Sequence, residues 1–304
     1  MPDSSMCGKR RAVVVINAYT TLESELHQPY AIAKALRERG VETDVLRNGC
    51  FPAYLERESI ASAWAEQYDF AVYLDKDKYL SKLLERAGMR LFNSSDAVEA
   101  CDDKLLTAIA LSGIAPMPKT LPAPLCYTPS AAVNEEMLNR AEELLGYPMV
   151  VKECFGSLGK GVHLARDRAE LRALSERLKG VPHLFQEFIQ ESKGRDLRVI
   201  LIGGKVVSAM ERRSEHDFRS NAELGGKGTP YTPDRETAAL CERVAEALRL
   251  DYCGVDLLFG KEGMLLSEVN SNAFFGTIER VTGVDVAARY AEYLVKTVYG
   301  DCFL

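Results

Sequence analysis

Two carboxylates and a carboxamide near the C-terminal end have the spacing that points most directly to chemistry. Glu268 and Asn270 stand two apart in LLSEVN, so on a β-strand both side chains point to one face. Asp256 lies in the apolar run GVDLLF, which we expect to form a neighbouring strand, and an unpaired carboxylate there would be costly. Three oxygen ligands on adjacent strands suit a hard cation, Mg²⁺ or Mn²⁺. A solvent-facing polar side of the hairpin is the alternative interpretation.

A glycine-rich segment follows the strand MVVK. Lys152 ends this strand, and Gly156, Gly159 and Gly161 follow in FGSLGKGV. Glycines let backbone N–H groups approach anionic oxygens and let a loop move. The run is too short for the P-loop pattern G-x-x-x-x-G-K-[ST] and lacks the hydroxyl after the lysine. It therefore predicts either an anion-binding loop or a plain flexible turn between two strands.

A third cluster is rich in arginine. Asp196 and Arg198 flank Leu197, so on a strand they share a face. Further charged or polar residues follow within a short span, namely Glu211, Arg212, Arg213, Arg219 and Asn221. Guanidinium groups that converge on a phosphate or an oxyanion would explain the cluster. Taken by itself, the cluster is better explained by an ion-pair network on a surface hairpin.

The elements that must position these residues begin with an alternation of strands and helices. The patterning predicts strands at 12–18, 41–47, 69–74 and 90–93, and helices at 29–39 and 77–87. This order implies a small parallel sheet. The first strand is followed by NAYTTLES rather than by G-x-G-x-x-G, which excludes a dinucleotide site of that kind.

Residues after 95 are expected to form a longer, mixed arrangement. Five prolines between 116 and 129 mark a connecting segment, and a β-hairpin turns at Gly203-Gly204. A polar loop is expected at 214–230, before the strands YCGVDLLFG and GMLLSEVN. Helices are expected at 96–111, 130–145, 167–179, 234–249 and 285–298.

Composition restricts the class of protein. The 304 residues carry a net charge of −6, which gives no general case for nucleic-acid binding. The eight cysteines show no C-x-x-C spacing, so we expect free thiols in a reducing cytoplasm and no zinc site. No apolar stretch approaches the ~20 residues that a membrane-spanning helix needs.

The order of motifs from about residue 90 to 300 resembles the ATP-grasp ligases and, within them, the RimK-like glutamate ligases. The matching runs are DDKLLT, MVVKECFGSLGKGV, FQEFI, RDLRVILIGGKVVSAMERR, DFRSN, GVDLL, EVN and IERVTGVD. The resemblance implies an α/β (α+β) ATP-grasp fold with an N-terminal Rossmann-like subdomain. The expected division is 1–95, then 96–185 with the glycine-rich loop, then 186–304 with the metal and nucleotide residues.

The resemblance also implies roles for individual residues. Lys104 and Lys152 would bind the ATP phosphates, and the backbone at Glu187 and Phe188 would contact the adenine edge. Arg212 and Arg198 would be catalytic, steadying an acyl phosphate and a tetrahedral intermediate. The nucleotide set is completed by Gly156, Ser157, Gly159, Gly161, Asp196, Arg219, Ser220 and Asn221. Asp256, Glu268 and Asn270 would hold Mg²⁺ or Mn²⁺, as two ions.

The implied reaction is the ATP-dependent joining of a carboxylate to an amine through an acyl phosphate, with the glycine loop closing over it. An amino acid such as glutamate would be added to a small molecule, a peptide or a protein tail. A phosphotransferase and a non-catalytic ATP-binding protein are the alternatives. After the metal asparagine the run Ser271–Gly276 (SNAFFG) departs from the family's small residue, proline and glycine, and its two phenylalanines line an acceptor pocket or belong to the core. The acceptor and any homo-oligomer stay open.

Overall fold

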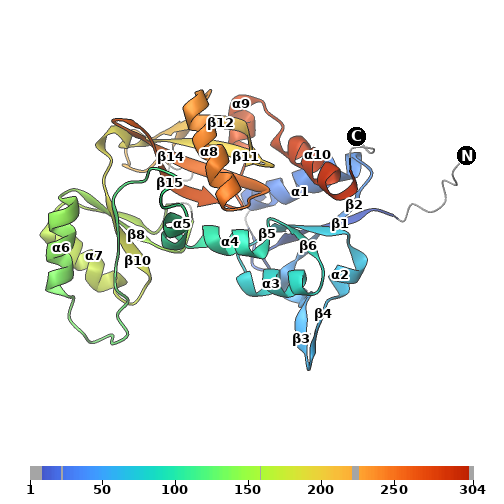
Figure 1. The fold of residues 1–304 in the computed structure, drawn as a ribbon, viewed down its shortest axis with the longest axis horizontal. Coiled ribbons are helices and arrows are strands. Elements are labelled where there is room, and N and C mark those ends of the chain that lie inside the picture. The colour runs from blue at the N-terminus through green and yellow to red at the C-terminus, as the bar shows by residue number, and fades with distance from the viewer. Residues whose placement is uncertain (1–8, 22, 158, 221–225, 301–304) are drawn as a thin grey trace, which may run out of the picture.

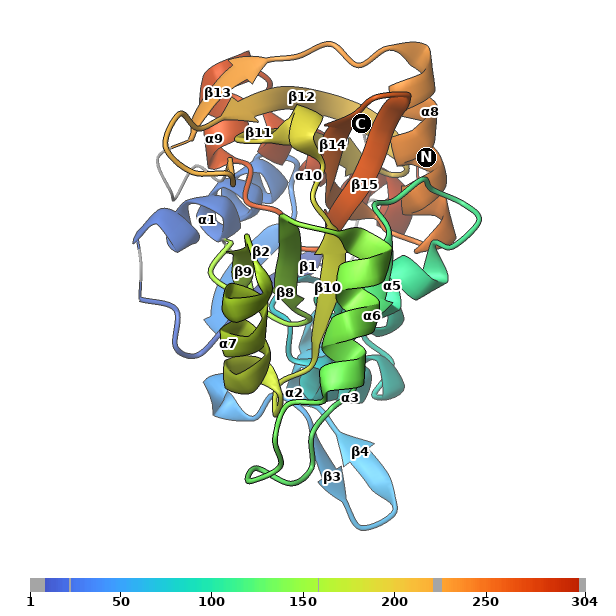
Figure 2. The same ribbon diagram turned by 90° about the vertical axis from the view of Figure 1, so that its left-hand side faces the viewer.

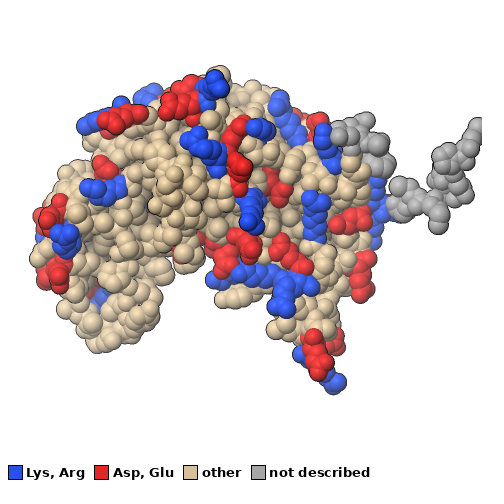
Figure 3. Space-filling view, in the orientation of Figure 1, with Lys and Arg blue, Asp and Glu red and all other residues tan. Residues whose placement is uncertain are grey.

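Three β-sheets organise the chain in the computed structural model, which describes residues 9–21, 23–157, 159–220 and 226–300. One sheet is parallel and two are antiparallel. In Figure 1 the antiparallel sheet that contains β8 (Met149–Glu153) and β10 (His183–Glu187) forms a lobe of its own at the left. Figure 3 shows an indentation between two lobes. One lobe contains α6 (Glu135–Leu145) and α7 (Arg168–Leu178), and the other bears the hairpin of β3 (Tyr54–Glu56) and β4 (Ser59–Ala61). Lysines, arginines and carboxylates are interspersed on that face, so it presents both signs of charge.

The N-terminal sheet has the order β2-β1-β5-β6, with every neighbouring pair parallel. Val13, Val14 and Val15 of β1 are fully buried because helices cover both faces of the sheet. The parallel sheet expected from the sequence is therefore confirmed. Its elements are β1 (Arg11–Ile16), α1 (Glu23–Glu38), β2 (Glu42–Arg47), a 3₁₀ turn (Asn48–Cys50), β3 (Tyr54–Glu56), β4 (Ser59–Ala61), α2 (Ala63–Gln67), β5 (Phe70–Leu74), α3 (Lys78–Arg86) and β6 (Arg90–Phe92).

The second sheet, β7-β10-β8-β9, is covered on one face by two helices. Met149 and Val151 of β8 pack against Leu138 of α6 and Leu171 of α7. Figure 2 looks onto these helices, which lie in front of β8 and β10. The elements of this part are α4 (Ser95–Asp102), α5 (Lys104–Ala110), β7 (Thr120–Pro122), α6 (Glu135–Leu145), β8 (Met149–Glu153), β9 (Val162–Ala165), α7 (Arg168–Leu178) and β10 (His183–Glu187).

The third sheet, β13-β12-β11-β14-β15, separates two apolar cores. Odd-numbered Leu197 and Val199 of β11 pack toward α8, whereas even-numbered Ile200 and Ile202 pack toward α1 and α10. The remaining elements are a 3₁₀ turn (Gln190–Ser192), β11 (Arg195–Ile202), β12 (Lys205–Arg213), β13 (Lys227–Pro230), α8 (Arg235–Ala247), β14 (Tyr252–Gly260), β15 (Gly263–Asn270), α9 (Gly276–Thr282) and α10 (Val286–Tyr299).

Two expected helices differ from those observed. The single helix at 96–111 is wrong, because Asp103 is extended and caps α5 by accepting hydrogen bonds from the Leu105 and Leu106 amides. Helix α1 begins at Glu23 and contains Pro29, which was expected to start it. Burial of the apolar face of α1 against β1 and α10 outweighs the local cost of the proline.

Several short elements were not expected from the patterning. Strand β13 lies within the predicted polar loop 214–230 and is formed by pairing with β12 rather than by its own composition. Helix α6 begins at Glu135 instead of 130, where Asn134 supplies the N-cap. The elements without any prediction were β3, β4, α2, β7 and α9.

Two further expectations concern thiols and membranes. The six cysteines within the described ranges are all free thiols, as expected, while Cys7 and Cys302 lie outside them. Among the described helices, none is both long enough and apolar enough to cross a membrane.

Asn93 joins the N-terminal sheet to the third sheet. It follows β6 and is 1% exposed. Its Nδ2 donates to the carbonyls of Tyr252 and Ser271, both at 2.8 Å. Its Oδ1 accepts from the amides of Asp251 at 2.7 Å and Tyr252 at 3.0 Å. One side chain thus satisfies four backbone groups.

We expect Asn93→Ala to lower the free energy of unfolding by about 3 kcal/mol, because the backbone groups it serves lose their partner in a buried place. Denaturant titration measures this change. Asn139→Ala is the matched control, since Asn139 lies on the exposed side of α6 and should change the value by about 0.5 kcal/mol or less. Equal effects of the two substitutions would contradict the role of Asn93.

Candidate active site

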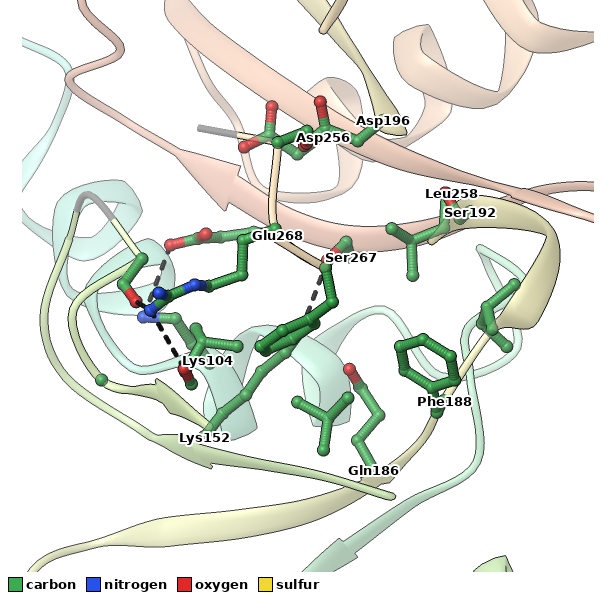
Figure 4. Close-up of a pocket in the computed structure, with 18 of the residues that line it drawn as sticks. Lys104, Lys152, Gln186, Phe188, Ser192, Asp196, Asp256, Leu258, Ser267 and Glu268 are labelled. Atoms are coloured by element: carbon green, nitrogen blue, oxygen red, sulfur yellow. Dashed lines mark hydrogen bonds and ion pairs between the residues drawn. The ribbon is translucent and has the colours of Figure 1, made fainter. Parts of the chain in front are cut away.

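A pocket lies between the second and third sheets (Figure 4). Val150 and Lys152 alternate with the core residues of β8 and therefore face the pocket. Asp196 of β11 and Glu268 of β15 face it from the other sheet. The same alternation that builds the two cores thus turns charged residues toward each other.

Lys152 and Lys104 supply positive charge at one wall. Lys152 is 9% exposed, and its Nζ donates to Ser267 Oγ at 3.3 Å. Burial, aided by the nearby Lys104, lowers the pKa of Lys152 to about 8, against the opposing effect of Glu268. Lys104 Nζ lies 3.4 Å from Glu268 Oε1 and donates to the Gly156 carbonyl at 2.9 Å. The two lysines are placed to receive an anion between them.

The glycine-rich segment closes one side of the pocket. Gly156 and Gly159 have positive φ values of 115° and 72°, which L side chains rarely adopt. A Cβ atom on Gly161 would lie 2.9 Å from the Cβ atom of Glu153, so no larger residue fits without a shift. Arg219 Nη1 donates to the Gly159 carbonyl at 2.7 Å. Arg219 therefore holds the hairpin, in addition to lining the pocket.

Four charged side chains form an ion-pair chain on the third sheet, which we call the arginine chain: Asp196, Arg212, Asp256 and Arg198. Arg212 and Asp256 at its centre are buried, and Asp196 and Arg198 at its ends are partly buried. Arg212 Nε lies 2.7 Å from Asp196 Oδ1, and Arg212 Nη2 lies 3.1 Å from Asp256 Oδ1. Arg198 Nη2 lies 2.7 Å from Asp256 Oδ2, and its Nε also donates to Oδ1.

The charges of the arginine chain stabilise each other. Burial opposes the charge of Arg212, but Asp256 and Asp196 outweigh it and raise the pKa of Arg212. Burial also opposes ionisation of Asp256, but Arg198 and Arg212 hold the pKa of Asp256 below its ordinary value. The pocket therefore keeps a permanent guanidinium at its wall.

The oxygen donors expected to bind metal are adjacent. Asp256 and Glu268 are direct partners across β14 and β15, and Asn270 Nδ2 lies 3.4 Å from Asp256 Oδ2. Within the described residues no group of three or more His, Cys, Asp or Glu gathers as metal ligands. Two carboxylates and a carboxamide fit a hard cation that takes further ligands from phosphate. Glu268 is the more accessible donor, because Arg198 and Arg212 already occupy Asp256.

Ser267 is a pocket residue that sequence reasoning missed. Strict alternation would place it opposite Glu268, yet both line the pocket. The register shifts between Asp256 and Leu257, which pair with Glu268 and Leu266 and leave Ser267 as an extra residue. Such a bulge puts consecutive side chains on one side. The other lining residues without a predicted role are Val150, Glu153, Phe155, Val162, Gln186, Ile189, Ser192, Arg195, Phe218 and Leu258.

Most of the residues selected from the sequence lie at this pocket. Arg198 and Asn270 do not line it but contact Asp256. The Glu187 amide donates to the Lys119 carbonyl at 2.9 Å and is already engaged. Asn221 lies outside the described residues. The residues selected from the sequence that line the pocket are Lys104, Lys152, Gly156, Ser157, Gly159, Gly161, Glu187, Phe188, Asp196, Arg212, Arg219, Ser220, Asp256 and Glu268.

Comparisons with known proteins agree on one family. A family model described as the RimK-like ATP-grasp domain matches residues 123–294. Beta-citrylglutamate synthase B of Danio rerio is 36% identical over 229 residues, covering 74% of this chain and 55% of that protein. A probable alpha-L-glutamate ligase of Maridesulfovibrio salexigens is 36% identical over 219 residues, covering 70% and 69%.

The fold has solved counterparts. D-alanine–D-alanine ligase from Bacillus anthracis, complexed with ATP, matches with a TM-score of 0.72 and 17% identity, covering 95% of this chain and 97% of that one. The chain spans about half the length of the beta-citrylglutamate synthases that it matches.

The pKa of Lys152 predicts how anion binding depends on pH. A bound triphosphate favours the charged lysine, so the complex binds more protons than the free protein above about pH 8. We expect the affinity for a non-hydrolysable ATP analogue to be constant below this pH and to fall by up to about tenfold per unit above it. Calorimetry between about pH 7 and pH 9 measures the slope.

Lys152→Met is the control, because the methionine side chain does not titrate. Its affinity should be weak at every pH in that range and should lack the slope. An identical slope in the wild type and in Lys152→Met would mean that another group titrates.

Proposed function

The chain belongs to the RimK-like ATP-grasp family, and from this premise we propose that it is an ATP-dependent ligase that joins a carboxylate to an amine. The observation that carries the proposal is the convergence of Lys104, Lys152 and Arg212 on one pocket that also holds Asp256 and Glu268. Cations for phosphate and carboxylates for a metal are the two requirements of phosphoryl transfer. The glycine-rich segment with Gly156, Gly159 and Gly161, which we call the glycine hairpin, lines the same pocket as these cations and carboxylates.

The nucleotide would occupy the space between the two antiparallel sheets. The lysines bind its phosphates as point charges, and the Phe188 side chain forms a wall for the base. Ser220 and Asp196 lie in the same lining and complete the polar contacts. Arg219 acts indirectly, by holding the glycine hairpin through the Gly159 carbonyl.

Glu268, Asp256 and Asn270 would hold Mg²⁺ or Mn²⁺, as two ions. When bound, the metal neutralises charge between phosphate oxygens. Glu268 would exchange its ion pair with Lys104 for the metal, which frees the Lys104 ammonium for phosphate. Arg198 keeps Asp256 ionised and fixed throughout.

The carboxylate substrate attacks the γ-phosphate, which gives an acyl phosphate and ADP. The amine then forms the C–N bond as the C–O bond to phosphate breaks. Phosphate leaves with the electron pair and takes one proton from the substrate ammonium, while the second proton goes to solvent. Arg212, held by two carboxylates, is placed to stabilise the oxyanion, and the glycine hairpin limits access of water.

The relatives' names support an amino acid as one substrate. The names of both relatives described above contain glutamate: one is a citrylglutamate synthase and the other is a probable glutamate ligase. Glutamate is therefore one of the amines to test. The carboxylate to which glutamate is added would belong to a small molecule, a peptide or a protein tail.

We expect Glu268→Gln to lower kcat by about a hundredfold, because a neutral amide replaces a carboxylate that offsets the charge of the cation. ADP release is measured with ATP, Mg²⁺ and pairs of carboxylates and amines, and mass spectrometry identifies the product. Glu262→Gln, an exposed change in the turn of the same hairpin, is the matched control and should leave kcat unchanged.

Release of ADP that requires both substrates, with an amide product, supports the proposal. A phosphorylated hydroxyl compound as the product would refute it in favour of a phosphotransferase. Equal kcat values for Glu268→Gln and Glu262→Gln at limiting Mg²⁺ would remove Glu268 from the metal site.

A further inference from the structure

A second cleft adjoins the candidate active site. It has a volume of about 320 Å³ and lies where the carboxyl ends of β1 and β5 meet α1 and the segment after β15. Ser157 of the glycine hairpin lines both this cleft and the first pocket. A molecule in the cleft would therefore lie next to the first pocket. The residues that matter most here are Glu25, Gln28, Asp75, Asn272 and Phe274.

The side-chain amides of Asn272 and Gln28 form a short hydrogen-bonded series that leaves one buried oxygen, Gln28 Oε1, without a donor. The Leu74 carbonyl can only accept, so Asn272 Nδ2 must face it, at 2.9 Å. Asn272 Oδ1 then accepts from Gln28 Nε2 at 3.2 Å, which fixes the orientation of Gln28. Gln28 Oε1 has no hydrogen-bond partner, although the residue is 2% exposed. Buried polar atoms are normally paired, so this oxygen calls for a donor from a ligand.

Asp75 is a carboxylate in the cleft with only neutral donors. Asn17 Nδ2 lies 3.1 Å from its Oδ2, the Lys76 amide lies 2.7 Å from its Oδ1, and Asn48 also donates. Within the described residues it has no ion-pair partner. Burial raises the pKa of Asp75, as expected for a carboxylate without a cation. An ammonium group would supply the missing charge.

The rest of the lining favours the same kind of ligand. Glu25 adds a second carboxylate, and Pro29 has no N–H to donate to the Glu25 carbonyl one turn earlier. No Lys or Arg is among the described residues of the lining. Phe274 is 38% exposed and lines the cleft, whereas Phe275 is fully buried in the core. The two phenylalanines of the departing loop thus have different roles.

We propose that this cleft binds the amine substrate through Gln28 and Asp75 and selects a non-acidic amine. This proposal depends on the ligase function proposed above and specifies the chemical class of its amine substrate. An ammonium group satisfies Gln28 Oε1 and the Asp75 carboxylate together, and Phe274 packs against an apolar portion. A carboxylate on the amine would face Asp75 and Glu25 without a cation in return. Asn272 is a positioning residue, since it acts by orienting Gln28.

A series of three probes tests the selection. L-leucinamide, L-leucine and L-glutamate carry no, one and two carboxylates, and we expect kcat/KM to fall in that order. Asp75→Asn and Gln28→Leu should each raise the KM for L-leucinamide by about tenfold or more and leave the KM for ATP unchanged. Asp44→Asn, a carboxylate of the same sheet that binds Arg11 and Tyr68, is the matched control and should change neither value.

Calorimetric titration of L-leucinamide into the protein with ADP separates this proposal from the ligase function. Loss of binding in Asp75→Asn, with no ADP release for any substrate pair, would leave the cleft assignment standing and refute the ligase. ADP release that requires both substrates, with glutamate preferred or with an unchanged amine KM in both variants, would refute the cleft assignment alone. Absence of binding by all three probes would also refute it. Because Asp75→Asn is isosteric, a failure of Gln28→Leu to fold leaves the test intact.

Discussion

The arginine chain is the interaction on which the rest of the structure depends. Four charges lie on one sheet face, and the two buried ones, Arg212 and Asp256, are each paired with two opposite charges. Removal of one partner from such a set leaves an uncompensated buried charge, at a cost of about 3–5 kcal/mol. The pairing of β11 with β12 and β14 must therefore keep its register, since a slip by one residue would turn Asp196 and Arg198 into the α8 core.

The same face of β11 serves both stability and chemistry. Ile200 and Ile202 at one end pack with α1 and α10, and Asp196 and Arg198 at the other end belong to the arginine chain. The change from apolar to charged side chains occurs within a few residues on one face. The third sheet thus supplies a wall of paired charges to the site, and the glycine hairpin of the second sheet supplies the wall opposite.

Much of this site could be predicted because its residues are close in sequence and obey the period of a strand. Asp196 with Arg198 is such a pair, and the parallel N-terminal sheet followed from the order of its elements. Ser267 could not be found, because a bulge breaks the alternation that the prediction assumed. Gln28 and Asn272 meet across most of the chain, and no local pattern reports such a contact. Strand β13 likewise exists through its partner β12.

Helix α10 completes the apolar core that it shares with α1 and β1, and this has a consequence for the folding of the chain during its synthesis. Ile32 and Leu36 of α1 share a core with Tyr290 and Leu294 of α10, and Asn93 finds its partners only at residues 251, 252 and 271. A chain that emerges from the ribosome N-terminus first holds these apolar and polar groups without their partners until the residues of α10 have been made. One face of the N-terminal sheet therefore stays uncovered for that interval, which exposes the nascent chain to aggregation.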